Sequence, residues 1–218
     1  MERHFDLELA DLKKTLLTMS AMVEETINRA VSSLEKLSPE LAREVISADE
    51  SIDRIEIAID DKTFDLIIRH QPLAGDLRLI LMAGKIGTEL ERIADLAVDI
   101  AQRTLKLAGQ PLIKPLVDIP KLSSLAQQMV RDSIQSFVNL DVTLARSICK
   151  RDDEADSLRD AVYRELSEIV RRDGGLADRA IPLILVSRHL ERICDHATNI
   201  AEDVVFLVEA KFIKHCGK

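Results

Sequence analysis

The feature that most constrains the fold of this chain is an internal repeat. The segment LERIADLAVDIA at residues 90–101 reappears as LERICDHATNIA at residues 190–201, with eight of twelve positions identical. A matching acidic pair precedes each copy: Asp49 and Asp53 before the first, and Asp152 and Asp156 before the second. Such self-similarity indicates that one supersecondary unit occurs twice. We therefore expect two related units, residues 1–110 and 117–218, joined by a Pro-containing linker at residues 109–115.

Each unit is expected to form three helices. Apolar residues recur at steps of three and four in the first segment, at Leu9, Leu12, Leu16, Met19, Val23 and Ile27. The predicted helices cover residues 5–37, 39–69 and 76–109 in the first unit, and 119–149, 151–172 and 179–214 in the second. Ser38 and Asp76 are the predicted N-caps, and Pro182 is expected in the first turn of the last helix or at a kink. Short turns between long helices predict an all-α fold of two tandem three-helix bundles, elongated and flat.

Composition excludes several classes of protein. The net charge of -8, from 30 basic and 38 acidic residues, argues against nucleic-acid binding. No apolar run approaches the length of a membrane span, and the N-terminus does not open a signal peptide, so we expect a cytoplasmic protein without membrane insertion. The three cysteines, Cys149, Cys194 and Cys216, are too widely spaced to indicate a disulfide framework or a thiolate zinc site.

Acidic residues at helical spacing are the candidate functional groups. Glu91, Asp95 and Asp99 would line one face of a helix, and the pair Asp49 and Asp53 would face them from the preceding helix. The second unit repeats the pattern with Asp152, Asp156, Glu191, Asp195 and Asn199. Like charges at this spacing destabilise a helix, so a cation, arginine side chains or protonation must compensate them. Carboxylates suit Mg²⁺, Ca²⁺ or Mn²⁺, and iron where oxygens bridge several ions.

Simpler interpretations of the same residues remain open. Arg92 and Arg192 can pair with the aspartates three positions later, and the acidic stripes can be solvated. His189 and His196 have no counterparts in the first unit, so we expect them to be solvated or capping histidines. The sequence contains no Gly-rich phosphate loop and no recognisable catalytic triad, and it offers no nucleophile. The residues alone therefore identify no catalytic group.

The two LERI-x-D-x-A motifs, each preceded by an Asp-x-x-x-Asp helix, resemble those of the PhoU family. The segment QPLAGDLR at residues 71–78 is similar to that family's turn into its third helix. The resemblance implies a cytosolic negative regulator of the phosphate-starvation response that links the ATPase of the phosphate transporter to a sensor histidine kinase. It also implies a homodimer or larger assembly, and multinuclear iron or zinc clusters on the acidic motifs of some members. Where the family commonly has Asn, this chain has Asp99.

Two alternatives lead to different experiments. A metal-free helical adaptor would share the same partners but would not depend on Asp95 or Asp195. A carboxylate-bridged di-iron oxidase in a helical bundle usually takes Glu-x-x-His from two helices, and this chain has no Glu followed three residues later by His.

Overall fold

Six long helices, arranged as two trios, make up most of the computed structural model, which describes residues 4–211 and 213. The first trio consists of α1 (His4–Glu35), α2 (Pro39–His70) and α3 (Ala74–Leu107). The second consists of α4 (Asp118–Asn139), α5 (Val142–Arg172) and α6 (Ala177–Glu209), with a 3-10 turn, η1 (Gly174–Leu176), before α6. The predicted all-α fold of tandem three-helix bundles is confirmed.

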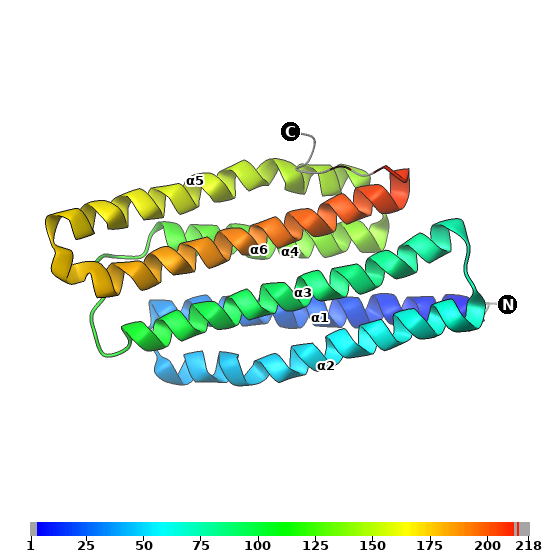
Figure 1. The fold of residues 1–218 in the computed structure, drawn as a ribbon, viewed down its shortest axis with the longest axis horizontal. Helices are drawn as coiled ribbons and strands as arrows, with labels where there is room; N and C mark the ends of the chain where they lie inside the picture. Colours follow the sequence, from blue (N-terminus) through cyan, green and yellow to red (C-terminus); the bar gives the residue numbers. More distant parts are fainter. Residues whose placement is uncertain (1–3, 212, 214–218) are drawn as a thin grey trace.

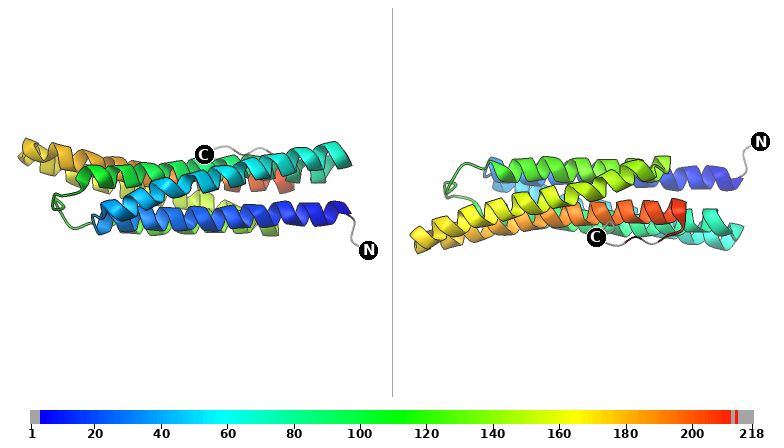
Figure 2. Two further views of the ribbon diagram at one scale, coloured as in Figure 1. Left: turned by 90° about the horizontal axis from the view of Figure 1, so that it is seen from below. Right: turned by 90° about the horizontal axis from the view of Figure 1, so that it is seen from above.

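The two trios lie side by side along one long axis (Figure 1). Helices α3 and α6 occupy the middle of the molecule, where each packs against the other and against the two remaining helices of its own trio. Helices α2 and α5 form the outer edges, and α1 and α4 pack together in a second layer (Figures 1 and 2). Figure 2 shows that the molecule is thin in the direction perpendicular to this face. Among the described residues, no helix is long and apolar enough to cross a membrane.

The central helices bury a wide apolar stripe because they contact neighbours on several sides. Leu90, Ile93 and Ala97 of α3 are fully buried, and so are their counterparts Leu190, Ile193 and Ala197 of α6. Small residues let α2 approach α3 closely: a Cβ atom at Gly87 would lie 3.1 Å from Cγ2 of Ile59. This close approach brings the facing sides of α2 and α3 within reach of one another.

Two of the predicted helix starts can be compared with the structure. The Ser38 side chain caps α2 by accepting a hydrogen bond from the Leu41 amide at 3.3 Å, and Pro39 opens the helix, as predicted. The predicted cap at Asp76 is wrong, because α3 begins two residues earlier and Asp76 lies in its first turn. There its carboxylate is still placed favourably at the positive end of the helix dipole.

The break between the first two helices of the second trio lies elsewhere than predicted. We expected it near residue 150, whereas α4 ends at Asn139 and α5 begins at Val142. Leu140 adopts a left-handed conformation with φ of 53°, and Asp141 caps α5 by accepting from the Leu144 amide at 2.9 Å. The prediction failed because an apolar periodicity that continues past this cap conceals the turn.

The last helix differs from its prediction at both ends. It begins at Ala177, so Pro182 is its sixth residue and is buried within a continuous helix. It ends at Glu209 rather than 214, where Ala210 takes a left-handed conformation. Residues 212 and 214, and with them Cys216, lie outside the described residues.

The cysteines also depart in part from the expectation. Cys194 is a free, buried thiol, as a small core residue would be. Cys149 is disulfide-bonded, which the sequence analysis did not expect. Wide spacing in the sequence misled us here, because a helical bundle brings distant segments together.

Polar side chains cross the boundary between the two trios. Lys85 of α3 donates to Asp203 of α6 at 2.6 Å, and His196 Nδ1 lies 2.6 Å from Glu89 Oε2. Arg131 of α4 forms an ion pair with Glu24 of α1 at 2.7 Å. We call the Lys85, Glu89, His196 and Asp203 contacts the α3–α6 seam. Since Asp203 is only 5% exposed, its charge depends on Lys85 for compensation.

We predict that Lys85→Met lowers the free energy of unfolding by about 1–3 kcal/mol, the usual cost of leaving a buried acceptor without its partner. The double variant Lys85→Met/Asp203→Leu should recover most of this loss, because it removes the buried charge as well. Urea unfolding measures both. Lys121→Met is the matched control, since Lys121 pairs with Asp118 at 3.0 Å on the surface. Equal losses in Lys85→Met and Lys121→Met would contradict the prediction.

Candidate functional site

The four acidic residues of the first unit come together between α2 and α3. Asp49 and Asp53 lie on α2, and Glu91 and Asp95 lie on α3. Burial raises the pKa of Asp49, and the charges of Asp53 and Asp95 raise it further. Carboxylates affect one another in this way only when they are close in space. The sequence-based expectation that the two pairs face each other therefore agrees with the structure.

Glu91 is the most strongly perturbed carboxyl group of this first acidic site. Burial raises its pKa to about 7, with further contributions from Asp95, Glu56 and Asp53 that outweigh the opposite effect of Arg92. Glu56 thus belongs to the site, although the sequence analysis did not identify it. Within the described residues, none of the five carboxylates forms an ion pair with Lys, Arg or His. This site carries excess negative charge.

The second acidic site has the same four groups on α5 and α6. Burial raises the pKa of Asp195, and Asp152 and Asp156 raise it further. Burial likewise raises the pKa of Glu191, as does Asp195, but Arg159 acts in the opposite direction. The two acidic sites therefore contain equivalent carboxylates, but they differ in the cation that lies nearest to those carboxylates.

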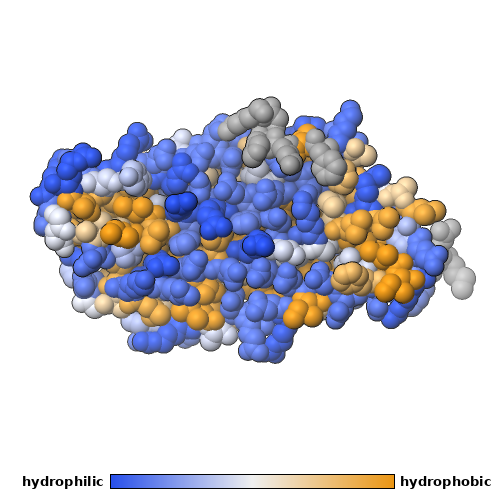
Figure 3. Space-filling model, in the orientation of Figure 1, coloured by the Kyte–Doolittle hydropathy of each residue, from blue (hydrophilic) through white to orange (hydrophobic). Residues whose placement is uncertain are grey.

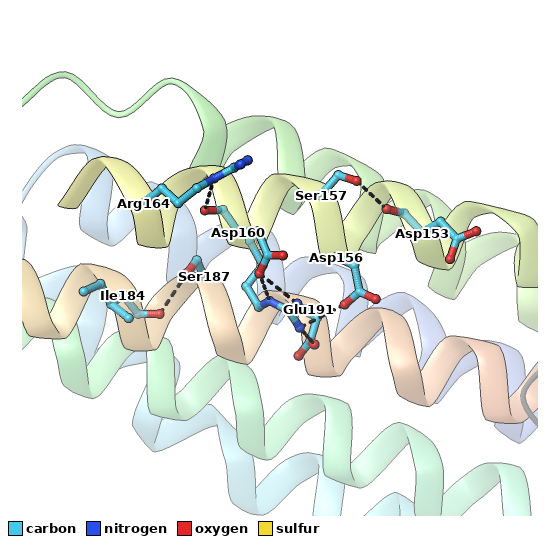
Figure 4. A network of polar contacts seen from close by, with 9 residues as sticks. Asp153, Asp156, Ser157, Asp160, Arg164, Ile184, Ser187 and Glu191 are labelled. Atoms are coloured by element: carbon cyan, nitrogen blue, oxygen red, sulfur yellow. Dashed lines mark hydrogen bonds and ion pairs between the residues drawn. The ribbon is translucent and has the colours of Figure 1, made fainter. Parts of the chain in front are cut away.

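Arg159 lies among the carboxylates of the second site. Its Nη1 contacts Asp156 Oδ1 at 2.9 Å and also contacts Glu191, while Nε and Nη2 donate to Asp160 Oδ1 at 3.0 and 2.9 Å. Figure 4 shows Asp156 and Asp160 of α5 and Glu191 of α6 converging on this point. The sequence analysis considered Arg192 as the local ion-pair partner and missed Arg159. The available signal was its position, three residues after the second aspartate of the motif.

Asp99 and Asn199 have partners outside the acidic sites. Asp99 lies 3.9 Å from Arg103 and 3.8 Å from His189 Nδ1. Asn199 donates to Glu89 Oε2 at 3.3 Å across the α3–α6 seam. The structure thus places both residues toward the boundary between the trios, one turn beyond the paired carboxylates.

The two histidines are neither solvated nor capping, so that expectation is wrong. His196 bonds to Glu89 of the other trio. Burial acts to raise the pKa of Glu89, but the hydrogen bonds from His196 and Asn199 lower it below its ordinary value. Burial lowers the pKa of His189, whose two ring nitrogens have no hydrogen-bond partner within the described residues. Both side chains lie at the packed boundary between the trios, which a sequence cannot locate before the trios are docked.

The donor chemistry fits a hard cation, but the side chains are not arranged as a coordination shell. Within the described residues, no three Asp, Glu, His or Cys groups are close enough to hold a single ion. What the structure does provide is two sets of partly buried carboxylates, in which burial and then the charges of neighbouring carboxylates raise the pKa values of Asp49 and Asp195. A bound cation would remove that repulsion.

We predict that, in metal-free protein, the stability of the wild type falls relative to Glu91→Gln as the pH rises from about 4.5 to about 7. A carboxyl group whose pKa is raised by folding binds its proton more tightly in the folded state, so ionisation over this range favours unfolding. Above pH 7 the difference should level off. Urea unfolding across this range tests the prediction. Glu50→Gln is the control, because Glu50 is exposed and forms an ion pair with Arg54. Parallel curves for wild type and Glu91→Gln would contradict it.

Comparisons with known proteins agree with this architecture. The model of the PhoU domain matches the chain twice, at residues 16–104 and 119–204. The phosphate-specific transport system accessory protein PhoU homolog of Aquifex aeolicus is 41% identical over 95% of this chain and 94% of its own length. The Escherichia coli accessory protein PhoU is 30% identical over 98% of this chain and 88% of its own length.

A solved structure shows the same fold. The crystal structure of PhoU from Pseudomonas aeruginosa superimposes with a TM-score of 0.91 at 35% identity, and covers 95% of this chain and all of that one. A twofold match along the chain, relatives that align over nearly their full length and a near-identical fold lead to one conclusion. The chain belongs to the PhoU family, the accessory and regulatory proteins of phosphate transport systems, which are not enzymes.

Proposed function

We propose that this protein is a cytoplasmic negative regulator of the phosphate-starvation response, which links the ATPase of a phosphate transporter to a sensor histidine kinase. The observation that carries the proposal is the twofold match to the PhoU domain, with an acidic motif present in each repeat. In this role the protein acts by binding rather than by catalysis. It would bias the kinase toward its silent state when phosphate is plentiful.

Exposed apolar side chains support a function that works through protein contacts. Figure 3 shows apolar surface at the end of the molecule that carries the α2–α3 turn, and a further apolar area at the opposite end. The large apolar side chains exposed on that part of the chain are Phe64, Ile68, Leu73 and Leu81. Contiguous exposed apolar surface is typical of sites that bind another protein or a second copy of the same chain. Homodimers or larger assemblies are part of the same proposal.

The acidic sites are the proposed metal centres. Asp49, Asp53, Glu91 and Asp95 would hold one cluster, and Asp152, Asp156, Glu191 and Asp195 the other. Iron or zinc clusters, or otherwise Mg²⁺, Mn²⁺ or Ca²⁺, would be held by oxygen ligands. When bound, the metal neutralises facing carboxylates and ties α2 to α3 and α5 to α6. Asp99 and Asn199, with partners at the boundary between the trios, are left out of the ligand set.

A metal-free adaptor is the second candidate function. It is favoured by one observation, the guanidinium of Arg159 among the carboxylates of the second site. An arginine can compensate these charges without any ion. In that case the protein would regulate through its helical surfaces alone.

Deleting the gene should raise expression of phosphate-starvation genes when phosphate is plentiful, because the kinase loses its repressing partner. A reporter fused to a starvation promoter measures this, and the wild-type gene supplied in trans is the control. If the genes stayed repressed in the deletion strain, the regulatory role would be wrong.

Elemental analysis of protein purified without chelator or affinity tag distinguishes the two candidates. We predict at least one metal ion per repeat in the wild type, and its loss when Glu91, Asp95, Glu191 and Asp195 are changed to Gln or Asn. The matched control neutralises four exposed carboxylates elsewhere: Glu44, Glu50, Asp65 and Glu168. The absence of metal from both the wild type and the site variant would favour the metal-free adaptor.

A further inference from the structure

The two acidic sites differ at one equivalent position. Arg159 follows Asp156 by three residues in the second repeat, and Glu56 follows Asp53 by three residues in the first. Arg159 contacts Asp156 and Glu191, which come from the two helices that form its site. Glu56 instead adds its charge to that of Glu91. One site thus contains a built-in cation, and the other contains an additional anion.

The contacts of Arg159 divide into two groups. Nη1 contacts Asp156 of α5 and Glu191 of α6, the carboxylates through which the two helices would hold a metal ion. Nε and Nη2 are held by Asp160. Asp160 has no acidic counterpart in the first repeat, where Ile57 occupies the equivalent position and is exposed. Asp160 therefore accompanies the arginine as its anchor.

We propose that Arg159 occupies the place of a cation in the second acidic site, so that the two sites of one chain bind metal unequally. The first site takes a divalent cation directly. The second takes one only when the guanidinium releases Asp156 and Glu191. This inference rests on the proposed metal-binding function and adds to it the residue that determines which site is filled first.

The surroundings give the guanidinium room to withdraw. A pocket of about 520 Å³ adjoins the second site and is lined by Arg159, Asp160, Tyr163, Arg188 and other residues. Arg188 and Arg192 line the same pocket, and their positive charges repel a third guanidinium there. Contact with Asp160 compensates this repulsion, so Arg159 can turn about Asp160 without becoming unpaired.

The contacts of Arg159 make the binding of a metal ion less favourable at the second site than at the first. A metal ion that enters the second site must break two charge-assisted contacts of Arg159, whereas an ion that enters the first site relieves repulsion among carboxylates. Loss of one hydrogen bond to a charged group corresponds to about a tenfold change in affinity. We therefore expect the second site to bind a divalent ion at least about tenfold more weakly than the first.

Calorimetric titration of the metal-stripped full chain with Mn²⁺ at pH 7 tests this difference. The wild type should show a tighter and a weaker class of site, with Asp95→Asn removing the former and Asp195→Asn the latter. Arg159→Gln should tighten the weaker class about tenfold, and Glu56→Arg should weaken the tighter class. Arg164→Gln is the matched control, because Arg164 is exposed on the same helix and its Nε donates only to a backbone carbonyl, that of Asp160. It should behave as the wild type does.

A second measurement separates metal selection from a merely structural ion pair. Without metal, Arg159→Gln should melt at a lower temperature than the wild type, because the carboxylates lose their cation. Mn²⁺ should then raise the melting temperature of Arg159→Gln more than that of the wild type. A purely structural arginine would lower the melting temperature without any gain in Mn²⁺ affinity, which would overturn the proposal. Arg159→Lys keeps the charge with fewer hydrogen bonds and should fall between the two, which preserves the test if Arg159→Gln does not fold.

The failures of this inference and of the proposed metal function are distinguishable. Equal Mn²⁺ affinities at the two sites, unchanged in Arg159→Gln, would overturn the role of Arg159 and leave metal binding in place. No Mn²⁺ binding in the wild type or in Arg159→Gln would overturn both. Binding that appears only in Arg159→Gln would support Arg159 as the resident cation of the second site but would overturn direct binding of metal at the first.

Discussion

The packing of α3 against α6 is the contact on which the rest of the structure depends. These two helices lie in the middle of the molecule, where they join the two trios and each packs against both other helices of its own trio. Their repeated motifs supply the fully buried Leu, Ile and Ala residues on one side of each helix and the acidic residues on another. The same twelve-residue pattern therefore fixes the core and positions the carboxylates, so that a change in one cannot leave the other unaffected.

The acidic sites are places where the fold tolerates an unfavourable arrangement. Carboxylates that face each other across two packed helices oppose that packing, and the pKa of Glu91 is raised first by burial and then by this repulsion. The surrounding apolar core is extensive enough to hold the helices together in spite of it. Natural chains usually keep such local conflicts where a function requires them. The two repeats resolve the conflict differently, with a guanidinium in one and no resident cation in the other.

Local signals and repetition in the sequence were sufficient for the fold and for the facing acidic pairs, because both depend on helical periodicity. The prediction failed where a periodic stretch ran through a turn, as at Asp141, whose capping role competes with the apolar pattern around it. It failed again for His189 and His196, since their surroundings come from the other trio. Arg159 was missed because its position three residues after Asp156 does not by itself show that its side chain reaches across to Glu191 of α6.

The α3–α6 seam has a consequence for the history and assembly of the chain. Its polar contacts are not reciprocal: the repeat equivalents of Glu89 and His196 are His189 and Leu96, and the equivalent of Asp203 is Arg103. If two first repeats docked in the same way, Glu89 would meet Leu96 and Lys85 would meet Arg103, which leaves a buried charge without a partner and places like charges together. A duplicated unit that once paired with its own copy would thus have diverged into two repeats. The first and second repeats now fit each other better than either would fit a copy of itself. Such divergence disfavours the pairing of like repeats from two chains, because that pairing would lose these contacts.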